Sequence, residues 1–100
     1  MAYITTKDKK QAITIGKALM KKKLAACVNI IPSMYSSFRW QGKILNASEA
    51  ILIVKSIESK KEGILKEVKR LHSYSVPCIL FVDIQSGNPD YIQWLHEECF

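Results

Sequence analysis

The sequence lacks several features that would assign it to a class of protein at once. It has only three cysteines among 100 residues, and no two of them form a Cys-x-x-Cys pair. An odd number of widely spaced cysteines argues against a disulfide framework and predicts a reducing compartment, the cytoplasm. No apolar run is long enough for a secretory signal or a membrane span, so we expect neither.

Motifs of common enzyme classes are also missing. The chain has no Gly-x-x-x-x-Gly-Lys loop for phosphate and no Gly-x-Ser-x-Gly turn for a nucleophilic serine. We also find no paired carboxylates that the pattern would bring together for acid–base chemistry. The sequence therefore predicts a protein that is not an enzyme.

Acidic residues are scarce relative to basic ones, and the formal net charge is +6. This charge permits a nucleic acid, a small anion or a membrane surface as partner, but it selects none of them. A sheet that binds RNA would need aromatic side chains on its central strands, and the stretch Ala50–Ile57 has none. We therefore expect no nucleic acid and no membrane among the partners.

The chain is centred on a long apolar hairpin. One arm runs from Leu24 to Trp40, a turn follows at Gln41–Lys43, and the second arm continues to Ile57. Runs rich in β-branched and aromatic residues around a glycine turn are typical of two paired strands. Both arms exceed the usual strand length of about 5–6 residues, which predicts a hairpin that extends beyond the core of the domain.

The remaining segments complete an α+β pattern in one domain, residues 1–100. Residues 2–5 form a short strand, and a helix capped by Thr6 or Asp8 follows it. A Ser-x-x-Glu capping box at Ser59 opens a second helix, residues 78–84 form another strand, and Asn88 caps a short final helix with Pro89 in its first turn. The order β-α-β-β-α-β-α predicts a ferredoxin-like βαββαβ sandwich with an added C-terminal helix.

The strands predict an oligomer because they are apolar on both sides. Along the second arm, Leu52 and Val54 point one way while Ile51 and Ile53 point the other. Both helices of a ferredoxin-like fold cover the same face of the sheet, so the second apolar face needs a cover from other copies. The aromatic residues Tyr35, Phe38 and Trp40 near the hairpin tip are candidates for this interface.

Three residues are candidates for a ligand cleft between subunits: Lys55, His72 and Tyr74. His72 is a candidate metal ligand, because imidazole is the commonest metal ligand, or else a residue at a helix end. Lys55 lies inside an apolar strand and either lines the cleft, where it could bind a small anion, or reaches solvent along its stem. Cys27 and Cys78 lie in apolar strands and are better explained as core residues than as thiolate ligands.

Four blocks of the sequence resemble a known family, the CutA or divalent-cation tolerance proteins. The blocks are Lys23–Pro32, Trp40–Ile44, His72–Pro77 and Gly87–Leu95, in that order along nearly the whole chain. The resemblance implies a ferredoxin-like fold assembled as a tight homotrimer, similar in build to the PII signalling proteins. It also implies a connection with tolerance of metal ions, copper above all, and brings no established catalysis.

The chain departs from the family pattern at several polar positions. The family loop usually reads His-Pro-Tyr-Glu-x-Pro, but Ser73 and Ser75 replace the proline and the glutamate here. Some members carry a cysteine and a His-His pair linked to copper, and the matching positions here are Ile4 and Leu71-His72. The resulting prediction is a non-enzymatic homotrimer for divalent metal tolerance, with copper or another divalent cation at the intersubunit cleft. The alternative is a PII-like signalling module that binds a nucleotide or small anion there.

Overall fold

The computed structural model describes all 100 residues and contains the predicted order of elements. None of its helices is sufficiently long and apolar to cross a membrane. The helices and strands are, in chain order, β1 (Ala2–Thr6), α1 (Lys9–Lys21), β2 (Cys27–Trp40), β3 (Lys43–Lys55), the short 3-10 helix η1 (Glu58–Lys60), α2 (Lys61–Leu71), β4 (Ile79–Phe81) and α3 (Pro89–Glu98).

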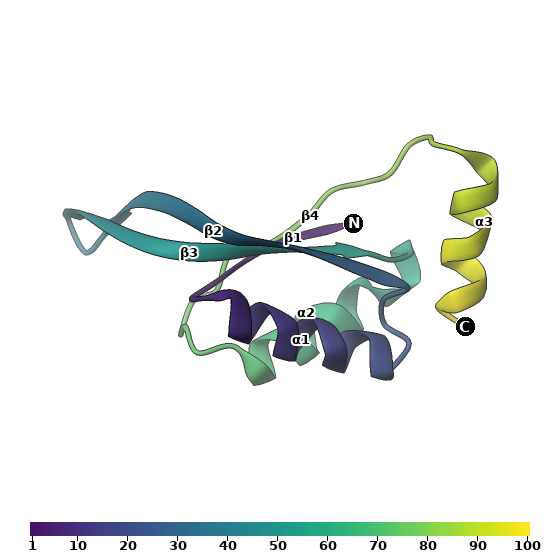
Figure 1. The fold of residues 1–100 in the computed structure, drawn as a ribbon, viewed down its shortest axis with the longest axis horizontal. Coiled ribbons are helices and arrows are strands. Elements are labelled where there is room, and N and C mark those ends of the chain that lie inside the picture. The colour runs from purple at the N-terminus through teal and green to yellow at the C-terminus, as the bar shows by residue number, and fades with distance from the viewer.

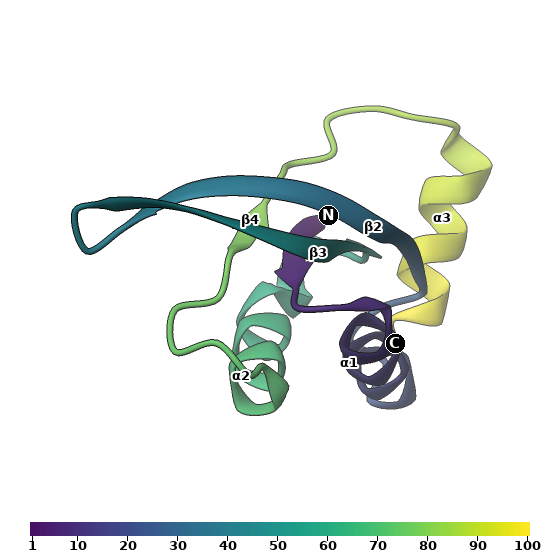
Figure 2. The same ribbon diagram turned by 60° about the vertical axis from the view of Figure 1, so that its left-hand side comes forward.

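The four strands form one antiparallel sheet in the order β2-β3-β1-β4. Helices α1 and α2 lie together under one face of this sheet, while α3 stands at the end where β3 finishes (Figures 1 and 2). This is the predicted ferredoxin-like arrangement, and the final helix is an addition to it.

The core lies between the sheet and its two helices. From the sheet, Ile4, Leu52 and Val54 are completely buried, and α1 contributes Ile15 and Leu19. Helix α2 adds Ile64 and Val68 to the same cluster. The apolar stripes of both helices therefore face the sheet, as the 3.6-residue period requires.

The opposite face of the sheet, called the open face below, has no helical layer. Strand alternation places Tyr3, Ile51 and Ile53 on it, because their neighbours in sequence point into the core. On the outer strands, Ile31 and Leu80 are 44% and 58% exposed on the same face. The chain therefore leaves apolar side chains uncovered on one side of its sheet.

The β2–β3 hairpin extends well beyond the helices, as Figure 1 shows. Its arms contain 14 and 13 residues, and the turn has positive φ angles at Gln41 and Gly42, which suits a two-residue hairpin loop. A bulge between Ile31 and Met34 inserts one extra residue at Pro32–Ser33. Proline is tolerated there because β2 is an edge strand.

Two helix caps agree with the prediction and one does not. Asp8 accepts a hydrogen bond from the Gln11 amide at 2.8 Å, and Asn88 accepts one from Asp90. The predicted capping box at Ser59 is wrong, because Ser59 lies inside η1 and α2 begins without a side-chain cap. A 3-10 turn that runs directly into the helix takes the place of the cap.

The strand predicted over residues 78–84 is also shorter than expected. β4 comprises only Ile79–Phe81, because its partner β1 begins at Ala2, which pairs with Phe81. Two more hydrogen bonds follow, one from the Val82 amide to the Met1 carbonyl and one from the Met1 amino group to the Val82 carbonyl. Beyond this point the apolar segment has no strand beside it within the chain, and Val82 and Ile84 are exposed.

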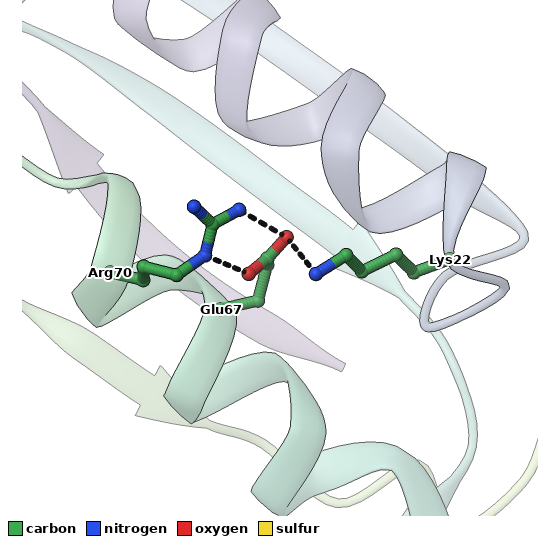
Figure 3. A network of polar contacts seen from close by, with 3 residues as sticks. All are labelled: Lys22, Glu67 and Arg70. Atoms are coloured by element: carbon green, nitrogen blue, oxygen red, sulfur yellow. Dashed lines mark hydrogen bonds and ion pairs between the residues drawn. The ribbon is translucent and has the colours of Figure 1, made fainter.

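Helices α1 and α2 are joined by a buried carboxylate (Figure 3). Glu67 is 5% exposed and forms two hydrogen bonds with Arg70, at 2.7 and 3.0 Å. Lys22, at the end of α1, lies 2.9 Å from the same carboxylate. Hydrogen bonds from Arg70 and then from Lys22 lower the pKa of Glu67 from 4.5 to about 2.

This pKa predicts a specific acid dependence. A carboxyl group whose pKa is lowered by folding adds stability that is complete above pH 4.5 and is lost as the pH falls through about 2. We expect Glu67→Gln to lower the urea midpoint at neutral pH, and the difference from wild type to disappear as the pH is lowered across that window. Glu62→Gln, an exposed neighbour on α2, is the control. A difference that stays constant down to the lowest pH would contradict the assignment.

Candidate functional site

A groove of about 780 Å³ opens on the open face, at the base of the overhanging hairpin. Tyr3 and Thr5 of β1, Glu49 of β3 and the segment 74–78 form one part of it, and residues 34–40 of β2 form the rest. Volumes of about 300–1,000 Å³ are usual for sites that bind small molecules. The groove brings together hydroxyl, carboxylate, guanidinium, sulfur and aromatic groups from segments far apart in sequence.

A short hydrogen bond joins two of these segments. The phenol of Tyr74 donates to Oε2 of Glu49 at 2.6 Å. Burial raises the pKa of Tyr74 to about 12, and the bond to Glu49 contributes in the same direction. Tyr74 is therefore a neutral hydrogen-bond donor at physiological pH, and it holds the Glu49 carboxylate in one orientation.

Glu49 is unusual because it is buried without a cation. It is 7% exposed, and no lysine, arginine or histidine forms an ion pair with it. Its Oε1 has no hydrogen-bond partner in the chain. Every side-chain oxygen that is fully buried does have a partner, so Oε1 is not fully buried. Oε1 is therefore accessible from the groove. The β2 bulge lies directly beside it, since Met34 is the residue paired with Glu49, and bulges commonly redirect side chains at functional sites.

His72 holds the loop that carries Tyr74. The Tyr74 amide can only donate, so its 3.1 Å bond to Nδ1 makes that nitrogen an acceptor and places the proton on Nε2. Nε2 then donates to the Thr5 carbonyl at 2.7 Å. The two rings also contact each other, with centroids 4.8 Å apart. Both nitrogens of His72 are thus occupied, and its role within the chain is to position Tyr74.

The chain does not bring Lys55 to His72 and Tyr74. Lys55 is the last residue of β3, opposite Cys27. Glu49 lies near the middle of that strand, and Tyr74 reaches it from the loop after α2. Its amino group lies over the ring of Tyr91 in α3, 5.6 Å from the centroid, a cation–π distance. Of the three residues predicted for a cleft, only His72 and Tyr74 are neighbours within one chain.

The predicted interface residues lie on the overhanging part of the hairpin. Tyr35, Phe38 and Trp40 are 76%, 40% and 44% exposed, and all three line the outer part of the groove. Aromatic rings with this much exposure are common where another protein chain binds. Their role in an interface stays a prediction.

Of the copper-linked positions of the family, only His72 carries a metal donor here. Ile4 lies in the core between the sheet and the helices, and Leu71 packs against the same core. No three His, Cys, Asp or Glu side chains are grouped as metal ligands. The residues present therefore do not fit a copper site of that type. The groups in the groove that could contact a cation are Glu49, Met34 and Cys78.

Glu49 is the functional candidate that the sequence reading missed. The signal was present, because Glu49 is the only acidic residue between Asp8 and Glu58. The bond that makes it distinctive comes from Tyr74, 25 residues away, and no local pattern predicts such a contact.

Comparison with known proteins agrees with this fold and these motifs. A family model described as "CutA1 divalent ion tolerance protein" matches residues 1–98. The divalent-cation tolerance protein CutA of Thermus thermophilus is 43% identical over 97 residues, which are 97% of this chain and 94% of the relative.

Solved structures are similar along the whole chain. The periplasmic divalent cation tolerance protein CutA of Archaeoglobus fulgidus has a TM-score of 0.96 at 41% identity, covering 99% of this chain and 96% of that one. CutA1 of Oryza sativa has a TM-score of 0.93 at 35% identity, covering 97% and 89%. Given the match over residues 1–98, this chain belongs to the CutA1 divalent ion tolerance protein family.

Proposed function

We propose that this chain acts as a non-enzymatic homotrimer in the tolerance of divalent metal ions, copper included, and that it binds them in the cleft between subunits. The observation that carries the proposal is the open face of the sheet, with a groove where the hairpin begins to overhang. The three thiols form no disulfide, which supports a reducing compartment such as the cytoplasm.

The open face supports association of several copies. Transfer of one Ile or Leu side chain from water into an apolar contact is worth about 1.5–3 kcal/mol, and Ile31, Leu80 and Val82 are substantially exposed. The outer edge of β2 also has no strand beside it over its 14 residues, and such edges pair readily with another chain. A closed ring of copies would cover both the face and the edge.

A second copy that packs on the open face would close the groove on its open side, because the groove opens on that same face. The donors available to an ion there are Oε1 of Glu49 and the sulfur atoms of Met34 and Cys78. Sulfur ligands favour copper in its reduced state. Direct ligation by His72 would require it to give up its bond to Thr5 or to Tyr74.

Calorimetric titration of the wild type and His72→Ala with Cu(I), Cu(II) and Zn(II) tests the metal site. We expect His72→Ala to weaken binding by about tenfold, because residues that hold the groups around a metal typically contribute 10–100-fold to affinity. His96→Ala, an exposed histidine on α3, is the control and should bind as the wild type does. Identical curves for all three proteins would remove His72 from the site.

A further inference from the structure

The two buried glutamates of this chain have very different side-chain partners. Glu67 is 5% exposed and has two cations, Lys22 and Arg70. Glu49 is 7% exposed and has only the neutral phenol of Tyr74. Burying a carboxylate is expensive unless a positive group compensates it. The chain supplies that group for Glu67 and supplies none for Glu49.

The surroundings of Glu49 indicate which kind of positive group would fit. Its free oxygen is accessible from a groove in which two tyrosine rings lie nearby: Tyr74, which donates to Glu49, and Tyr3, whose hydroxyl donates to the sulfur of Met34 opposite Glu49. Phe38, Arg39 and Trp40 line the part of the groove toward the hairpin turn, several strand positions from Glu49. One carboxylate together with aromatic rings is a combination that suits an organic cation, since the ring faces attract a positive nitrogen while the carboxylate accepts its hydrogen bond. The hydrogen bond from Tyr74 holds the carboxylate in place before any partner arrives.

We propose that Glu49 is the anchor of a site for a cationic nitrogen, an ammonium or guanidinium group, in this groove. The inference deepens the proposed function and rests on it in treating the groove as a part of the intersubunit cleft. The nitrogen can come from a small amine or from a basic side chain of a second copy. Both sources use the same chemistry, a salt bridge to Oε1 beside aromatic rings.

The test compares tyramine with p-cresol, which has the same ring without the amine. Binding is measured by NMR chemical-shift titration of the wild type, Glu49→Gln and the control Glu62→Gln, whose carboxylate is exposed on α2. We expect the wild type and Glu62→Gln to prefer tyramine by about tenfold or more, in keeping with hydrogen bonds to charged groups, and Glu49→Gln to lose that preference.

Sedimentation of the same three proteins on dilution distinguishes the two sources. If a second copy supplies the nitrogen, the wild type will show no preference for tyramine, but Glu49→Gln will dissociate at concentrations where wild type and Glu62→Gln stay assembled. That result also supports the proposal. The proposal is overturned if Glu49→Gln matches the wild type in both measurements.

Tyr74→Phe is the control for an effect of Glu49→Gln on folding alone. It removes the hydrogen bond and keeps the negative charge, so we expect it to keep most of the charge-dependent effect. Equal losses in Tyr74→Phe and Glu49→Gln would make the pair a purely structural contact and overturn the proposal. Absence of metal binding or of a trimer in the wild type would instead count against the proposed function. The comparison of tyramine with p-cresol could still be interpreted in that case.

Discussion

Ile51→Asp is expected to separate the proposed homotrimer into single chains. Ile51 lies on the open face between Ile31 of β2 and Thr5 of β1, where no helix covers it. A carboxylate there would have to lose its water when a second copy packs on the face, and a buried charge without a partner is strongly unfavourable. Each subunit also loses an Ile contact worth about 1.5–3 kcal/mol, so association should weaken by more than tenfold.

Thr14→Asp is the matched control for this change. It adds the same charge at an exposed position of α1, on the helical side of the sheet, and should leave the mass of the assembly unchanged. Size-exclusion chromatography with light scattering gives the mass of each variant. An Ile51→Asp protein with the wild-type mass would show that the open face is not the interface.

Leu52→Ala is expected to lower the free energy of unfolding by about 2–5 kcal/mol, the usual effect of truncating a fully buried leucine. Leu52 is adjacent to Ile51 but points to the other side, where it is completely buried. It pairs with Ile4 and Ile30 and lies so near α1 that a Cβ on Gly16 would sit 3.4 Å from it. The tight packing leaves little room for the cavity to collapse.

Urea unfolding of Leu52→Ala must be compared with wild type at one protein concentration, because assembly contributes to apparent stability. Met20→Ala, at a position of α1 that is 38% exposed, is the control and should lose far less. An effect below about 1 kcal/mol at Leu52 would contradict its place at the centre of the core.

Local patterns in the sequence predict most of the fold. The hairpin follows from β-branched residues around Gly42, and the caps at Asp8 and Asn88 follow from short-range hydrogen bonding. The errors arise where non-local pairing decides. The segment after Phe81 is as apolar as a strand, but β1 offers it no further partner.

The site was less predictable for the same reason. His72 and Tyr74 were identified from their loop, and the structure places them in contact. The sequence groups Lys55 with them because it interrupts an apolar strand. Within one chain Lys55 lies over Tyr91, and its place in a cleft between subunits stays a prediction. Glu49 is a candidate because it is buried and bonded to Tyr74, and the neighbouring residues in the sequence predict neither property.

Sedimentation equilibrium of the wild-type protein on dilution tests whether copies of this chain cover one another's open faces. Each chain has a mass of 11.4 kDa, so a trimer would have a mass of about 34 kDa, and we expect this mass at low micromolar concentration. A folded species at the single-chain mass that shows no association as the concentration rises would contradict it.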